Sequence, residues 1–260
     1  MITNLKNQRW LLMLGLLSLS LLALSGCSSD DDPTTPSGGS DAPTFTLGGD
    51  QTVDLPIALE ESSDPMAQAI VGMMNQVNAL SNMETIFTIP PGAVESQNKD
   101  TSWTYTWTTS EGSASLTVVL VVTETDDSYI WALSFNGTDG EETFEDFLIY
   151  RAEQAKDDSW GSFVIFGFEG DTEDVVLRWD WNTDSLGVYT MTMVGGSGGD
   201  TAKTEFVVQP TGAGSLDIYE MVGGNWQLVL HYDWSVLGTG NYAIYEDGVL
   251  VESGSWGGPA

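Results

Sequence analysis

The side chains that could carry out covalent or acid–base chemistry are few in this chain and mostly of one kind. Its 260 residues include 38 aspartates and glutamates, 7 lysines and arginines, one histidine and one cysteine, for a formal net charge of -31. A serine–histidine–aspartate triad would have to use His231, and one thiol, Cys27, can build neither a disulfide within the chain, nor a zinc site, nor an iron–sulfur cluster. The sequence therefore predicts no metal site and no cofactor, and leaves carboxylates as the candidate catalytic groups.

Paired carboxylates are the residues that glycoside hydrolysis needs, at a set separation. With 38 acids some pair will always look suitable, so the pattern identifies no catalytic residue, and hydrolysis stays open only as an alternative. The segment Asp180-x-Asn182-x-Asp184 resembles the opening of a calcium-binding loop. However, Ser185 replaces the glycine at position six and Met191 the glutamate at position twelve. We expect an acidic hairpin turn there.

The acidity itself excludes one class of partner. Proteins bind nucleic acid largely by neutralising its phosphates and releasing the counterions bound to them, whereas this acidic chain repels the phosphates. We therefore expect no nucleic acid to bind. Acidic turns could attract divalent cations or a basic protein. A saline habitat explains the charge more simply, because high ionic strength screens the repulsion.

The strands that would position these side chains are visible as alternation of apolar and polar residues from Thr44 onward. The clearest apolar row is Trp226, Leu228, Leu230, Tyr232 and Trp234. Period-two alternation predicts that this row is buried and that the opposite row, with His231, faces solvent. Similar rows begin at Trp103, Tyr129, Val175 and Tyr189. Turn signals such as Asn136-Gly137 separate them too closely for crossover helices. We therefore predict a mainly β fold, an antiparallel up-and-down meander of about a dozen strands curled into a barrel or half-barrel, because twist prevents so large a sheet from staying flat.

One amphipathic helix is expected at about 64–83. Its apolar residues recur at three and four positions, at Met66, Ala69, Ile70, Met73, Met74, Val77 and Leu80. Ser62 or Ser63 before Asp64-Pro65 provides the start of the helix. The segments 116–122, 147–150 and 163–168 are apolar on both faces, so we expect the helix to cover this first half of the sheet.

The meander, the aromatic wall and the single helix together resemble the lipid- and lipoprotein-carrier folds and the lipocalin-like barrels in architecture. That resemblance implies an apolar cavity, for which the candidate ligand-binding residues are Trp103, Trp131, Trp179 and Trp226. A membrane-spanning barrel is a further alternative.

The N-terminus has the pattern of a secretory signal. Lys6 and Arg9 precede the apolar run 10–24, which ends in Leu24-Ser25-Gly26-Cys27. This ending resembles the lipobox of bacterial lipoproteins, which implies removal of residues 1–26 and attachment of lipid, including palmitate-type acyl chains, to Cys27. Residues 27–42 then form a flexible acidic tether, and residues 43–260 a single β-rich domain with its covering helix.

The tether bears on location. The serine-then-acidic run after Cys27 resembles the export signal of surface lipoproteins in Bacteroidetes-type bacteria, and Ser28 stands where the enterobacterial rule for inner-membrane retention expects aspartate. We expect a lipid-anchored protein of the bacterial outer membrane, with surface display and oligomeric state left open.

Three functions remain open from the sequence. The first is a non-enzymatic binding or carrier module for an apolar or lipidic ligand. The second is a surface carbohydrate-binding or glycan-acting lipoprotein, and the third is a structural envelope domain without a ligand. The three differ in whether the aromatic face encloses space.

Overall fold

The computed structural model describes residues 42–46, 53–80, 86–99, 101–111, 114–138, 143–169, 172–197 and 200–257. Cys27, the expected signal peptide and nearly all of the expected tether lie outside these residues. Ser40–Ala260 group into one compact unit. Within the described ranges, no helix combines the length and apolar character needed to cross a bilayer.

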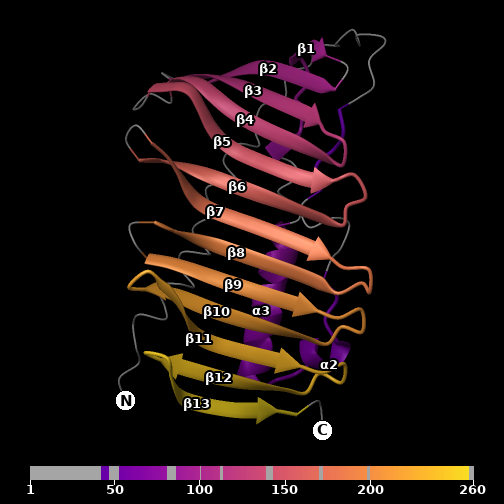
Figure 1. Ribbon diagram of the computed structural model, residues 1–260, viewed down its shortest axis with the longest axis vertical. Helices are drawn as coiled ribbons and strands as arrows, with labels where there is room; N and C mark the ends of the chain where they lie inside the picture. Colours follow the sequence, from indigo (N-terminus) through magenta and orange to yellow (C-terminus); the bar gives the residue numbers. More distant parts are fainter. Residues whose placement is uncertain are drawn as a thin grey trace. The chain divides into compact units, whose positions relative to one another are not determined.

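The fold is one antiparallel sheet in which each strand pairs with its neighbours in the chain (Figure 1). The thirteen strands are β1 (Val94–Lys99), β2 (Ser102–Glu111), β3 (Ala114–Glu124), β4 (Ser128–Thr138), β5 (Thr143–Ala155), β6 (Trp160–Glu169), β7 (Thr172–Thr183), β8 (Tyr189–Ser197), β9 (Asp200–Val208), β10 (Gly214–Val222), β11 (Asn225–Trp234), β12 (Gly240–Glu246) and β13 (Val249–Trp256). Among these strands β1 and β13 do not pair, so the sheet is unclosed. The predicted up-and-down meander with one amphipathic helix is confirmed, in an open form.

Three hairpins are closed by turns of the same build. Gly187, Gly212 and Gly238 each donate a backbone hydrogen bond to the carbonyl three residues earlier, over 2.9, 2.8 and 3.0 Å. Their φ angles are 76°, 83° and 74°, a left-handed conformation that only glycine adopts without strain. The glycines therefore fix where β8, β10 and β12 begin.

The amphipathic segment forms α3 (Pro65–Leu80), preceded by the short α2 (Ile57–Glu60). Asp64 accepts the amide of Met66 at 2.8 Å, which satisfies one of the free donors at the helix start. The Gln68 side chain donates to the carbonyls of Glu60 and Ser62, and so ties the end of α2 to α3. The α3 side chains of Ala67, Ile70 and Met74 are fully buried.

The sequence predicted that the helix covers the first half of the sheet, and this prediction was wrong. The segment leading to it, residues 53–60, crosses the later turns: Gly212 lies against Pro56, and Gly238 against Ala58 and Leu59. In Figure 1 α3 lies behind the later strands. The helix follows this segment and therefore begins beside β12. We call the face that carries α3 the inner face and the opposite one the outer face.

Two phenylalanines cover the earlier strands in place of the helix. The ring of Phe45 lies 5.2 Å from those of Phe87 and Trp131, 6.0 Å from Phe163 and 6.1 Å from Trp181, measured between centroids. Phe45 is 1% exposed and Phe87 6%. The inner face of β4, β6 and β7 is thus covered by two aromatic side chains that belong to no strand of the sheet.

Two side-chain amides fasten the N-terminal segments. Asn78 of α3 accepts the amide of Val53 at 3.0 Å and donates to its carbonyl at 3.1 Å, as a neighbouring strand would. Gln154, only 3% exposed, accepts the amide of Thr46 at 3.0 Å and donates to Asp158 at 2.6 Å.

Glycine–tryptophan pairs recur on the inner face. A Cβ atom added to Gly161, Gly214 or Gly240 would lie 2.2, 2.5 or 2.1 Å from the indole of the residue opposite, respectively Trp181, Trp234 and Trp256. Each ring therefore occupies the space that a side chain would take on the neighbouring strand. Trp234 and Trp256 also donate their indole N–H to the carbonyls of Gly212 and Gly238, at 2.8 and 2.9 Å.

Candidate functional site

Three of the four candidate tryptophans lie in the packed inner face. Trp103, Trp131 and Trp179 are 4%, 2% and 0% exposed. Trp131 donates its indole N–H to the carbonyl of Pro43 at 3.1 Å and contacts Phe45. The protein's own side chains fill the positions around these tryptophans that a ligand would otherwise occupy.

Trp226 is the exception, because the predicted alternation of its strand is interrupted. Ile218 pairs with Leu230, but the next residue of β10, Tyr219, pairs with Leu228, so Val229 is left out of the register as a bulge. The prediction that Trp226 shares a face with Tyr232 and Trp234 is therefore wrong. Trp226 lies on the outer face, half-buried.

Lys203 of β9 joins two aromatic rings on that face. Its ammonium lies 4.0 Å from the ring centroid of Tyr219 and 5.6 Å from that of Trp226, within the range of cation–π attraction. The same ammonium lies 2.8 Å from a carboxylate oxygen of Glu205. Burial raises the pKa of Tyr219 to about 12, helped by its hydrogen bond to Glu205 and by the charge of Asp217.

The single histidine is attached to the same cluster. His231 Nδ1 lies 2.6 Å from Asp217 Oδ1, while its Nε2 is 3.6 Å from Asp233 Oδ2, too far for a hydrogen bond. Asp233 is in turn held by the Asn241 amide at 2.9 Å. The His231 side chain is 35% exposed on the outer face, as predicted. Its partners are carboxylates, so it has the surroundings of an anchored surface group. We call Lys203, Glu205, Asp217, Tyr219, Trp226 and His231 the outer-face patch.

Two ion pairs and one histidine–carboxylate contact lie on this face, while Lys156 and Glu124 form a further ion pair of 2.7 Å outside the outer-face patch. Arg178 donates two hydrogen bonds of 2.7 Å to Asp180, Lys203 forms an ion pair with Glu205, and His231 is hydrogen-bonded to Asp217. The whole chain has only 7 lysines and arginines and one histidine for 38 acids. Exposed ion pairs contribute only about 0 to 1 kcal/mol each to stability. Two of the few lysines and arginines, Arg178 and Lys203, are thus held on the outer face by carboxylates.

The segment thought to resemble a calcium loop is held by other contacts. Asp184 accepts the backbone amides of Leu186 and Val188 at 2.8 and 2.9 Å, which closes the β7–β8 turn, and Asp180 is bound by Arg178. Within the described ranges, no group of three or more histidine, cysteine, aspartate or glutamate side chains is arranged around a common metal position.

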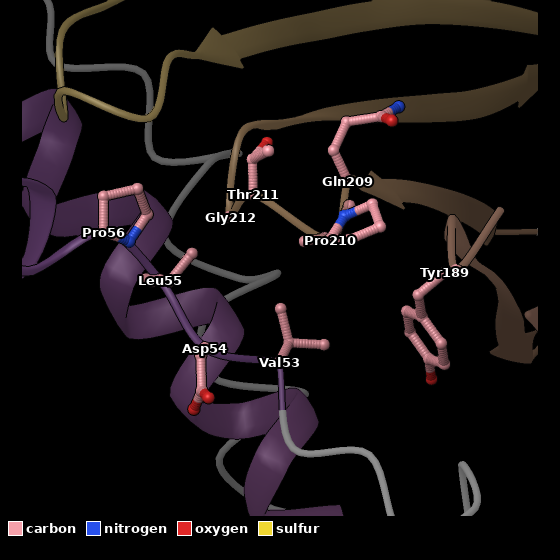
Figure 2. A pocket seen from close by; sticks show the side chains of 11 residues that line it. Val53, Asp54, Leu55, Pro56, Tyr189, Gln209, Pro210, Thr211 and Gly212 are labelled. Carbon is pink, nitrogen blue, oxygen red and sulfur yellow. The ribbon is translucent and has the colours of Figure 1, made fainter.

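A pocket of about 310 Å³ lies where residues 53–56 cross the β9–β10 turn (Figure 2). The side chains of Val53 and Leu55 reach toward the turn, whereas the Asp54 carboxylate and the Gln209 amide point away from it. Tyr189 lines the floor, and burial raises the pKa of its phenol. Because Asp54 and Gln209 point away from it, this pocket has the features of a gap between packed segments, among the residues that the structure describes.

A comparison of the chain with protein-family models and with curated proteins finds no match. The assignment of the candidate site therefore rests on the arrangement of the side chains in this structure. Sequence reasoning missed Lys203, Glu205, Asp217 and Tyr219, although Lys203 and Glu205 alternate with Thr204 and Phe206 in a readable strand pattern. Because lysine is scarce in so acidic a chain, the position of Lys203 in a strand was the signal that could have identified this site.

Proposed function

We propose that this protein is a lipid-anchored lipoprotein of the bacterial outer membrane whose folded domain is a non-enzymatic module that binds a glycan at the outer-face patch. The observation that supports the binding role is the patch itself. Two aromatic rings, Tyr219 and Trp226, share the Lys203 ammonium on an open sheet face. Tyr219 also interacts with Glu205 and Asp217, and Asp217 is hydrogen-bonded to His231.

This combination suits carbohydrate chemistry. A sugar ring presents an apolar C–H face and a rim of hydroxyl groups. Tyrosine and tryptophan offer large, rigid and amphipathic contact surfaces, and neighbouring carboxylates and imidazole accept hydroxyl hydrogen bonds.

An apolar ligand and glycan hydrolysis have less support than glycan binding. An apolar or lipidic ligand would need the inner tryptophans, and Trp131 and Trp179 are already covered by the chain's own packing. A glycoside hydrolase needs two carboxyl groups that flank a bond, whereas on this open face Glu205 is paired with Lys203 and Asp217 is hydrogen-bonded to His231.

Glycan binding is tested with the full-length protein in detergent, using insoluble neutral polysaccharides for pull-down and soluble oligosaccharides for calorimetry. Trp226→Ala should remove binding, since stacked aromatic residues dominate such contacts. Leu186→Ala, a change at a side chain 78% exposed in the β7–β8 turn, is the matched control and should bind normally. Equal binding by the two variants would refute the assignment of the patch.

The anchor is tested separately. Metabolic labelling with a fatty-acid analogue should mark the wild type and not Cys27→Ser, because the sulfur is the attachment point that the lipobox resemblance implies. Equal labelling of both proteins would remove the lipoprotein assignment.

A further inference from the structure

One row of polar side chains crosses the outer face from β7 to β13. Each member stands directly opposite the next on the neighbouring strand, and residues so paired share a face. Those with polar side chains, which we call the polar track, are Asp180, Thr192, Glu205, Asp217, His231 and Ser253. Ala243 interrupts the row between His231 and Ser253.

The spacing of the polar track is set by the sheet. Neighbouring strands lie about 4.8 Å apart, so the track offers a hydrogen-bonding group at nearly every such interval along a line perpendicular to the strands. A pyranose unit in an extended β-linked chain advances by a closely similar length. A linear glycan lying across the strands would therefore meet the protein once per sugar.

The chemistry of the polar track selects the kind of glycan. Two of its three carboxylates, those of Asp180 and Glu205, form ion pairs with Arg178 and Lys203, and the third, that of Asp217, is hydrogen-bonded to His231. They keep lone pairs free for further hydrogen bonds, because one carboxylate has about four acceptor sites. An acceptor-rich row suits hydroxyl donors. An anionic glycan would be repelled by a chain of formal charge -31.

We propose that the polar track is a linear binding site for an extended, neutral, hydroxyl-rich glycan that lies across β7 to β13, an inference that rests on the proposed glycan binding at the outer-face patch. Lys203 and Tyr219, opposite each other in the adjacent row, place the aromatic part of the patch beside the track. The contact is therefore extended, with several sugars bound in series.

The test is the dependence of affinity on chain length. Full-length protein in detergent is titrated with neutral β-linked glucose oligomers of two and six units, and with an acidic hexamer of galacturonic acid. A linear track predicts an affinity for the neutral hexamer at least about tenfold above that for the dimer, and weaker binding of the acidic hexamer.

Two variants locate the contact. Thr192→Lys, near one end of the polar track, should lower hexamer affinity at least about tenfold. The matched change Thr106→Lys on β2, opposite Val119 in the register and outside the track, should leave it unaltered. Melting temperatures of both variants are compared with the wild type, and Ser253→Lys, at an exposed position near the other end of the track, replaces Thr192→Lys if the latter unfolds.

The outcomes separate the two proposals. Binding that is lost in Trp226→Ala but is independent of oligomer length, or stronger for the acidic hexamer, overturns the track and keeps the patch. Absence of binding to every neutral glycan overturns both. Length-dependent binding that Thr192→Lys leaves intact while the variant stays folded also overturns the track.

Discussion

Replacing Gly240 by alanine is the sharpest test of how the sheet is packed. The new Cβ would lie 2.1 Å from Trp256 Cζ2 and 2.2 Å from the carbonyl oxygen of Asp233, where ordinary contact begins near 3.4 Å. The carbonyl belongs to β11, which pairs with β12 at this position, so it cannot retreat without breaking the ladder. The indole of Trp256 must leave its site.

The magnitude follows from what Trp256 loses. Its side chain is 4% exposed and donates to the Gly238 carbonyl at 2.9 Å. Losing a buried tryptophan contact costs about 3 to 5 kcal/mol, against a total stability of roughly 5 to 15 kcal/mol for a domain. We expect Gly240→Ala to lower the free energy of unfolding by about 3 to 5 kcal/mol, measured by urea denaturation with circular dichroism.

Gly72→Ala is the matched control with the opposite sign. Gly72 is exposed on α3 and has nothing within 4 Å of an added Cβ, so alanine should stabilise the helix by about 0.5 to 1 kcal/mol. A double variant, Gly240→Ala with Trp256→Ala, should cost clearly less than the sum of the two single losses, because the indole can be lost only once and the contact with the Asp233 carbonyl is all that remains of the clash. A loss below about 1 kcal/mol for Gly240→Ala, or full additivity in the double variant, would refute the packing argument.

Three further outcomes are expected. Trp234→Phe should lower the free energy of unfolding in urea by about 1 kcal/mol more than Trp181→Phe does. Both side chains are 3% exposed, but only Trp234 donates its indole N–H, whereas the N–H of Trp181 has no partner among the described residues. Equal losses in the two variants would contradict this. The free energy of unfolding should fall as pH rises from 10.0, the ordinary pKa of tyrosine, to about 12, because tyrosines in the unfolded chain ionise there before Tyr219 and Tyr189 do in the folded one. Tyr219→Phe should reduce this fall, and Tyr189 should account for part of the remainder; a stability that does not change with pH across this window would count against the raised pKa values. The melting temperature should rise with sodium chloride, because the screening length shrinks from about 30 Å at 0.01 M to about 3 Å at 1 M in a chain of formal charge -31; a flat dependence would show that the acids are already separated or neutralised.

Local patterns predicted the parts of this fold that depend on nearby residues. Alternation predicted the strands, the dipeptides Gly223-Gly224 and Asp247-Gly248 predicted hairpin turns, and the three-and-four spacing from Met66 predicted α3. The turn expected at Asn136-Gly137 was wrong, because both residues lie within β4 and pair with β3. The position of α3 over the later strands was not predictable in this way. It depends on contacts between residues 53–60 and the turns at Gly212 and Gly238, which are remote in sequence. The contact between Gly240 and Trp256 could likewise be predicted only if the register between β12 and β13 were known.

The candidate site shows most clearly why a periodic pattern was insufficient. Trp226 to Trp234 alternate without a break in the sequence, yet one residue, Val229, falls out of register with β10 and reverses the face of everything before it in the strand. A bulge is a property of a strand pair, so one strand read alone does not reveal it. The bulge brings Trp226 to the outer face beside Lys203 and Tyr219, while Tyr232 and Trp234 remain in the core. The same irregularity that defeated the prediction therefore assembles the aromatic part of the site.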